Sequence, residues 1–307
     1  MMSAIIAVVV LSIALAVSAD GFLTKKSILS ILNNAAVYIV VGLSQLVVMS
    51  VGQMNLALTS TAAVSAMTAM AFMEAFSLPL AVTILIGIAC GAFLGAIQGL
   101  LVAKSGINPF IVTLSLDSVI LGAGTAIFKA RVFNHVPTSF KSIFKVTFLG
   151  MPVALFISIG IVIIAWWFMK KTYFGRKLLA TGASPRAAYL AGINDKNQIW
   201  FAHILSGILA AIAGLLISAR LGAAQLSNGS EWMTLSFAVA VLAGSIMSGG
   251  KVGVVGTIFG AILFSMIKNG LVLWGVSFYW TNTFMGLLLL ACYELRRIKE
   301  KQKVKVG

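Results

Sequence analysis

The stretch PLAVTILIGIACGAFLGAIQGLLV, residues 79–102, decides how this chain folds. It has no charged residue, and as one α-helix it is long enough to cross the hydrocarbon core of a bilayer, about 30 Å. Glycines recur in it at every fourth position: Gly87, Gly91, Gly95 and Gly99. Small residues at that spacing let two membrane helices approach closely. The stretch therefore predicts a transmembrane helix packed tightly against another.

Similar apolar blocks recur along the whole chain. Hydrophobic residues make up 60% of its 307 residues and charged residues only 9%, too little charge for a soluble surface. Because the bilayer offers the backbone no hydrogen-bond partner, each span must be a helix. We expect an all-α fold, a polytopic transmembrane helix bundle of about ten spans in one domain over residues 1–307. The expected spans are 3–19, 35–51, 58–73, 79–102, 108–128, 150–169, 199–219, 232–248, 252–274 and 279–295.

The first block, residues 3–19, has two interpretations. Val17-Ser18-Ala19 before Asp20 resembles the small-residue cleavage site of a signal peptide. However, only Met1 and Met2 precede Ser3, so the positive segment that normally opens a signal peptide is missing. We favour a retained first span.

The net charge of +15 comes from basic residues between the apolar blocks and at the C-terminus. Segments assigned to the inside hold twice as many Lys and Arg residues as those assigned to the outside, which predicts both termini inside. The segment 170–198 and the basic tail 296–307 are then cytoplasmic. This distribution fits a lipid bilayer with anionic headgroups as the partner, and not nucleic acid.

Signatures of enzymes and metal sites are missing from the sequence. There is no HExxH motif, and His135 and His203 are far apart without acidic neighbours at ligand spacing. Cys90 and Cys292 lie in apolar stretches, where cysteine is a small core residue. No GxxxxGK[ST] phosphate-binding loop occurs, so an ATPase would have to be another chain. We expect no catalytic residue, no metal site and no cofactor.

The stretch VGQMNLALTSTAAVSA, residues 51–66, interrupts apolar sequence at membrane depth with uncharged polar residues. Such a polar break is tolerated where protein or an aqueous cavity replaces lipid. Its amides and hydroxyls suit a neutral, hydroxyl-rich solute better than an ion. We favour a translocation path through Gln53, Asn55, Thr59 and Ser60 over a simple polar contact between helices.

Asp117 lies in the middle of a predicted span, in IVTLSLDSVILG. Ionisable residues inside a membrane often bind a coupling ion, and Glu74 and Lys268 are the other candidates. Asp117 therefore supports an alternative function, an ion-coupled secondary transporter. The structural interpretation is that Asp117 bonds Ser115, Ser118 or a threonine of a neighbouring helix.

The longest polar segment between the spans, residues 170–198, predicts a short helix. Ser184 can cap it, Pro185 can open it and Gly192 can end it. A short helix in a cytoplasmic loop serves more often to dock a partner than as a solvated interfacial helix.

This segment resembles a motif of the membrane subunits of ribose/xylose/arabinose-type ABC sugar importers, T-x-x-GR-x-x-x-A-x-G-x-N-x-x-AA-x-x-x-GI, with Ser184 where Asn is usual. The resemblance continues through SGILAAIAGLLISARLGAAQ (206–225), AVAVLAGSIMSGGKVGVVGTIFGA (238–261) and KNGLVLWGVS (268–277). The matching residues of the loop are Thr172, Gly175, Arg176, Ala180, Gly182, Ala187, Ala188, Gly192 and Ile193.

The resemblance implies a single permease domain with the architecture of the vitamin-B12 importer (type II) permeases, in a bacterial inner membrane. It implies that two such subunits enclose one path, that cytoplasmic ATP-binding subunits drive it, and that a periplasmic or lipid-anchored binding protein delivers the solute. The path would include Gln53, Asn55, Thr59, Ser60 and Asp117. The ATPase-coupling residues would be Gly175, Arg176, Ser184, Pro185, Arg186, Ala187, Ala188 and Gly192.

The polar break departs from the family pattern. GGIDLSVGS is usual there, and this chain has GQMNLALTS, so Asn55 replaces Asp and Gln53 replaces Gly. These changes allow a solute that differs from ribose or xylose. They also allow the chain to pair with a second, non-identical permease.

Overall fold

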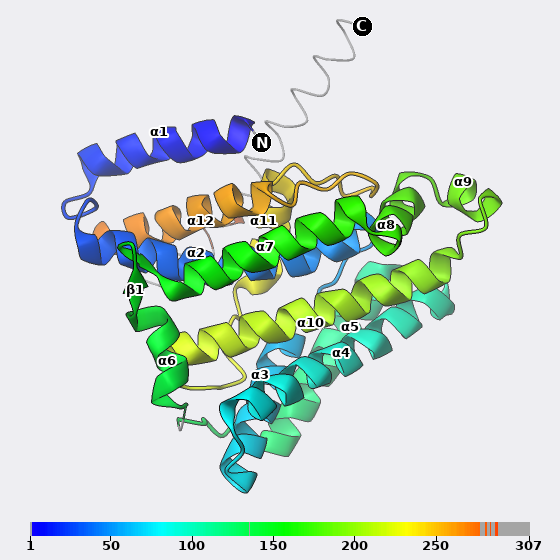
Figure 1. Ribbon diagram of the computed structural model, residues 1–307, viewed down its shortest axis with the longest axis horizontal. Helices are drawn as coiled ribbons and strands as arrows, with labels where there is room; N and C mark the ends of the chain where they lie inside the picture. The colour runs from blue at the N-terminus through cyan, green and yellow to red at the C-terminus, as the bar shows by residue number, and fades with distance from the viewer. Residues whose placement is uncertain (1, 135, 277–279, 281–282, 284–285, 288–307) are drawn as a thin grey trace, which may run out of the picture.

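The computed structural model describes the chain except residues 1, 135, 277–279, 281–282, 284–285 and 288–307. The described residues form a helix bundle with one small hairpin (Figure 1). The expected tenth span, 279–295, lies mostly outside them and the tail 296–307 entirely so. The helices are α1 (Met2–Ser18), α2 (Lys25–Ser50), α3 (Leu58–Phe76), α4 (Leu80–Ser105), α5 (Pro109–Phe128), α6 (Thr138–Lys145), α7 (Val153–Lys171), α8 (Tyr173–Ala183), α9 (Pro185–Leu190), α10 (Asp195–Leu221), α11 (Trp232–Leu242) and α12 (Gly256–Leu273).

Six of the described helices, not ten, are long and apolar enough to cross a membrane: α2, α4, α5, α7, α10 and α12. The all-α prediction is confirmed, and the span count is not. α11 ends at Leu242 because the chain enters an irregular segment, residues 243–255, in which Gly244, Gly249 and Gly250 have positive φ angles. The block expected as one span over 232–248 is therefore helix over its first 11 residues and loop over the remaining six.

α2 begins ten residues before the expected span, at Lys25, because Thr24 caps its first turn and accepts a hydrogen bond from the Ser27 amide at 3.3 Å. The asparagines of the extra turns form hydrogen bonds within the protein. Asn34, for example, donates to the Ser30 carbonyl oxygen at 3.1 Å. α2 is the central helix of the bundle and contacts α7, α10, α11 and α12.

The glycine face of 79–102 packs as expected. A Cβ atom at Gly207 of α10 would overlap the carbonyl oxygen of Gly91 and lie 3.0 Å from the Cα atom of Gly95, both on α4. The two backbones are therefore in direct contact, which glycine permits and larger residues do not. Most of the rest of α4, and most of α5 and α7, is unburied. Those apolar faces are open to lipid or to another subunit.

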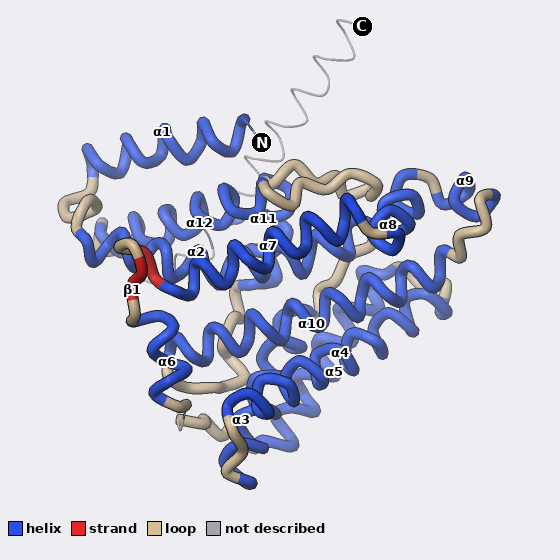
Figure 2. Tube along the Cα trace, viewed as in Figure 1, coloured by secondary structure: helices blue, strands red, loops and turns tan. Residues whose placement is uncertain are grey.

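Two elements between α5 and α7 are absent from the sequence-based expectation. α6 is amphipathic and buries Phe140 and Phe144. A two-stranded antiparallel hairpin of β1 (Thr147–Phe148) and β2 (Met151–Pro152) follows it. Together they cover the end of the bundle at which α2 begins and α10 ends (Figure 2).

Candidate functional site

The polar break is a turn between α2 and α3. Gly52 takes a positive φ of 72°, and the Gln53 amide donates to the Val48 carbonyl oxygen, so α2 stops at Ser50. The Asn55 carboxamide oxygen accepts from the Ala57 amide at 3.0 Å and leads the chain into α3. Of the break predicted over residues 51–66, only the seven residues 51–57 are non-helical, and Thr59 and Ser60 lie in the first turn of α3.

Asn55 connects the break to α10. It is 1% exposed, and its Nδ2 atom donates to the Ser206 hydroxyl at 3.1 Å. Ser206 in turn lies 3.0 Å from the Ser44 hydroxyl of α2. This chain of contacts holds the break against two long helices, in the interior of the bundle.

Asp117 of α5 lies at the N-terminus of α3. Its Oδ1 atom accepts a hydrogen bond from the Ser60 amide at 3.3 Å. Within the described residues, Ala57 at the N-cap of α3 makes no side-chain capping bond, so Asp117 supplies a cap from a neighbouring helix. A carboxylate there also interacts favourably with the α3 dipole. Asp117 thus bonds a neighbouring helix, as the structural interpretation expected, through a backbone amide and not a hydroxyl.

The other two candidates for ion coupling are paired. Glu74 lies 2.5 Å from Arg131, and Lys268 lies 2.5 Å from Glu231. A carboxylate or ammonium group engaged in this way is not preorganised to receive an ion in this conformation.

Gln53 and Thr59 differ from Asn55 and Ser60. Both are half-buried, and the Gln53 Oε1 and Thr59 Oγ1 atoms have no hydrogen-bond partner among the described residues. Of the five expected path residues, the structure therefore brings Ser60 and Asp117 into contact and fixes Asn55 to α10. It leaves polar groups of Gln53 and Thr59 unpaired.

The loop 170–198 contains two helices, where the sequence predicted one. The predicted helix is α9: Ser184 caps it, accepting from the Ala187 amide at 3.3 Å, and Gly192 follows it with a φ of 76°. The unpredicted one is α8, capped by Thr172, which accepts from the Gly175 amide at 3.1 Å. Gly175 is required because a Cβ atom there would overlap the Phe168 carbonyl oxygen.

The loop presents apolar and basic side chains to solvent. Tyr189 is 72% exposed and Leu190 80%, beside the exposed residues Arg176 and Arg186. A hollow of about 370 Å³ between α8 and the end of α9 is lined in part by Arg176 and Lys177. Exposed large apolar residues next to arginines are typical of a protein-binding surface. Tyr189 and Leu190 are the residues that the sequence analysis did not select for this role.

The end of α8 contacts the break directly. A Cβ atom at Gly182 would overlap the Ser50 carbonyl oxygen and lie 2.5 Å from the Gly250 amide nitrogen. The Gly250 amide donates to that same Ser50 oxygen at 3.0 Å. A Cβ atom at Gly249 would lie 2.7 Å from the Gly52 amide nitrogen. We call Gly52, Gly182, Gly249 and Gly250 the glycine junction.

The glycine junction joins three segments backbone to backbone: the loop helix α8, the break after α2, and the segment 243–255 before α12. In Figure 2 the segment between α11 and α12 extends toward α8. No side chains separate these backbones, so α8 is in direct contact with the polar break and with the segment 243–255.

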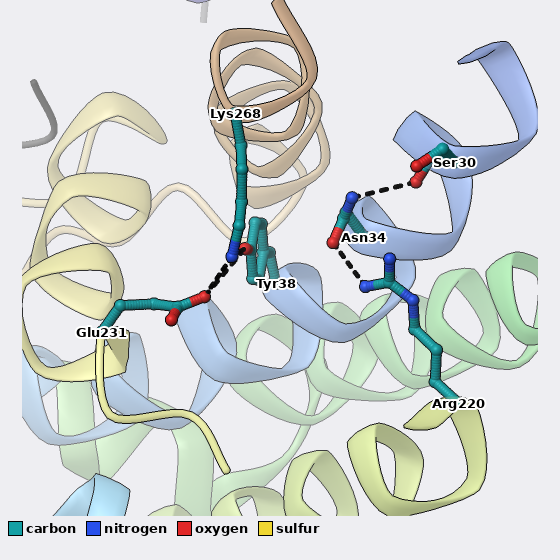
Figure 3. A network of polar contacts seen from close by, with 6 residues as sticks. All are labelled: Ser30, Asn34, Tyr38, Arg220, Glu231 and Lys268. Carbon is teal, nitrogen blue, oxygen red and sulfur yellow. Dashed lines mark hydrogen bonds and ion pairs between the residues drawn. The ribbon is translucent and has the colours of Figure 1, made fainter. Parts of the chain in front are cut away.

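A second polar cluster lies toward the opposite end of the bundle, the outer polar network of Ser30, Asn34, Tyr38, Arg220, Glu231 and Lys268 (Figure 3). Lys268 lies 2.5 Å from Glu231, and the Tyr38 hydroxyl contacts both, at 3.1 Å from Lys268 and 3.3 Å from Glu231. The Lys268 and Glu231 side chains are only 19% and 17% exposed.

The remaining members of the network lie beside this triad. Arg220 donates to the Asn34 side-chain oxygen, while Asn34 donates to the Ser30 carbonyl oxygen. The outer polar network therefore ties α2, α10 and α12 to the start of α11 by charged and polar contacts.

An apolar helix bundle with a polar break in its interior, and an exposed basic loop in backbone contact with that break, fits a membrane permease. The chain belongs to the family described as branched-chain amino acid transport system / permease component, whose model matches residues 27–293. It is a transport subunit and not an enzyme.

Curated relatives cover nearly the whole chain. The D-allose transport system permease protein AlsC of Escherichia coli is 29% identical over 95% of this chain and 90% of its own length. The ribose import permease protein RbsC of Haemophilus influenzae is 30% identical over 93% of this chain and 89% of its own length. The autoinducer 2 import system permease protein LsrD of Photorhabdus temperata is 28% identical over 82% of this chain and 77% of its own length. No solved structure matches this chain.

Proposed function

We propose that this chain is the membrane subunit of an ATP-binding cassette importer in a bacterial inner membrane, and that it translocates a monosaccharide or related small polar solute. The relatives named for ribose and allose support a sugar. The uncharged amide and hydroxyl groups of Gln53 and Thr59 are suited to hydroxyl groups of such a solute. Asn55, Ser60 and Asp117 belong to the same path and fix the geometry of its break.

The observation that carries the proposal is the glycine junction. In it the loop that would receive a partner is in backbone contact with the break that would line the path. Cytoplasmic ATPase subunits would bind the exposed residues of α8 and α9. Their closure on ATP would push α8, and the bundle would alternate between outward and inward openings by rigid-body motion.

The proposed assembly has further partners. A second permease subunit, identical or not, would cover part of the apolar surface that α4, α5 and α7 leave unburied. A periplasmic or lipid-anchored binding protein would deliver the solute at the end formed by α6, the hairpin and the outer polar network. The type II architecture belongs to this proposal.

Deleting residues 184–192 tests the proposed docking of the ATPase on α8 and α9. The membrane-inserted bundle is expected to remain, because α9 is exposed and contributes only Ala188 to the buried residues. Stimulation of the ATPase and ATP-driven uptake are expected to be lost, because the docking surface is gone. The measurement is uptake and ATP hydrolysis in proteoliposomes that contain the chain together with its ATPase and binding-protein partners. Normal uptake by the deletion variant contradicts the proposal.

The second candidate function is an ion-coupled carrier working through Asp117, and a conservative substitution separates the two. Asp117→Asn keeps an oxygen that can accept from the Ser60 amide, so we expect ATP-driven uptake within about threefold of wild type, given the small cost of losing one charge at a helix N-terminus. Asp117→Leu leaves that amide unpaired and is expected to destabilise the chain by about 1–3 kcal/mol.

The control is uptake by the chain reconstituted alone with an ion gradient and no ATPase. If the chain alone takes up the solute under those conditions, and Asp117→Asn abolishes that uptake, the chain is an ion-coupled carrier instead.

A further inference from the structure

Gln45 is the one glutamine on α2, and its whole side-chain amide is buried without a hydrogen bond to any described residue. The residue is 0% exposed, and neither its Nε2 nor its Oε1 atom has a hydrogen-bond partner among the described residues. Burying a carboxamide unpaired costs free energy, because water would satisfy every one of its donors and acceptors. The fold alone therefore gives no reason for a glutamine at this position.

The position of Gln45 places it at the depth of the polar break. Its neighbour Ser44 lies 3.0 Å from Ser206, which also accepts from Asn55. Seven residues, nearly two helical turns, separate Gln45 from Tyr38, so both lie on the same face of α2. Tyr38 points into the outer polar network (Figure 3). Gln45 thus lies on the face of α2 that runs from that network toward the break.

Gln98 on α4 provides an internal comparison. It is also 0% exposed, but its Nε2 atom donates to the Thr61 hydroxyl of α3 at 2.6 Å. Gln98 therefore has a structural role that Gln45 lacks: it connects two helices. Two fully buried glutamines of the same chain differ in whether the fold uses their amides.

We infer that Gln45 is a solute-contacting residue that selects the cargo, and that its amide bonds hydroxyl groups of a neutral polyhydroxylated solute while that solute passes the break. A carboxamide both donates and accepts, and so it matches a hydroxyl, which does the same. Gln53 Oε1 and Thr59 Oγ1, which also lack a hydrogen-bond partner among the described residues, are further uncharged polar groups in and beside the break. This inference rests on the proposed function, since it names a residue of the same path.

The test compares Gln45→Leu with Gln98→Leu. Leucine at position 45 removes polar atoms that the fold does not bond, so the melting temperature of the purified chain is expected to stay level or rise. Leucine at position 98 removes the bond to Thr61 and leaves that hydroxyl without it, so the melting temperature is expected to fall. A fall for Gln45→Leu as large as that for Gln98→Leu overturns the inference without any solute being needed, because the same change of shape is made at both sites and the fold would then bond both amides.

The second measurement is uptake of radiolabelled D-ribose and D-allose by the full complex. We expect Gln45→Leu to lower the maximum rate about threefold to tenfold, the effect of one lost hydrogen bond between neutral groups, and to change the ratio of the two rates. ATPase stimulation should remain, and Gln45→Asn should restore part of the uptake. Unchanged rates and an unchanged ratio overturn the inference. If the wild-type complex transports neither these two sugars nor any other monosaccharide under ATP, the proposed function fails instead, and the melting temperatures still decide whether the fold bonds Gln45.

Discussion

Replacing Gly182 with valine is expected to uncouple ATP hydrolysis from uptake. The new Cβ atom would overlap the Ser50 carbonyl oxygen, so α8 must separate from the break and from the segment 243–255. Overpacking of this kind typically costs about 1–3 kcal/mol, and here it falls on the contact that would transmit the motion. The expected result in proteoliposomes is that the ATPase still binds, while solute-dependent hydrolysis and uptake fall to background.

The matched control for Gly182→Val is Gly160→Val. Gly160 lies within α7, and in the described part of the chain nothing is within 4 Å of a Cβ atom built there. This variant is expected to behave as wild type. If Gly182→Val transports at the wild-type rate with an unchanged ratio of ATP hydrolysed to solute moved, the glycine junction does not transmit force.

Replacing Lys268 with methionine is expected to destabilise the bundle by about 1–3 kcal/mol, less than the cost of breaking a fully buried ion pair, because the two side chains keep 19% and 17% exposure. The Glu231 carboxylate, 17% exposed, would keep the Tyr38 hydroxyl at 3.3 Å and lose the ammonium group. Thermal unfolding of the purified chain in detergent measures the loss. Lys104→Met on the exposed last turn of α4 is the control and is expected to change stability by less than about 0.5 kcal/mol.

The double variant Lys268→Met/Glu231→Met gives the sharper comparison. It removes both charges, so no unpaired ion stays buried, and it is expected to be more stable than Lys268→Met alone. If the stability lost by the double variant equals the sum of the losses of Lys268→Met and Glu231→Met, the two residues are not energetically coupled. The outer polar network would then be a set of independent contacts.

The sequence was a good guide wherever the signal was local. Apolar blocks of membrane length, Ser184 before Pro185, and the uncharged polar residues of 51–57 each predicted an element that the structure contains. It was a poor guide where helix length depended on neighbours. Asn33 and Asn34 shortened the expected second span, yet α2 runs through them because Asn33 donates to the Phe144 carbonyl oxygen and Asn34 accepts from Arg220. Residues 232–248 read as one span, but the glycines of 243–255 end α11.

The amino-acid sequence by itself determined that this chain is an all-helical membrane protein with a polar break and a basic loop. Hydrophobicity, charge and capping act over a few residues and can be read one segment at a time. Only the tertiary structure decided which polar groups are bonded and which are not: Asp117 to Ser60, Lys268 to Glu231, Gln98 to Thr61, and Gln45 to no described residue. It also brought Gly52, Gly182 and Gly250 together. These relations join residues far apart in the chain, and they depend on how helices pack, which no single segment encodes.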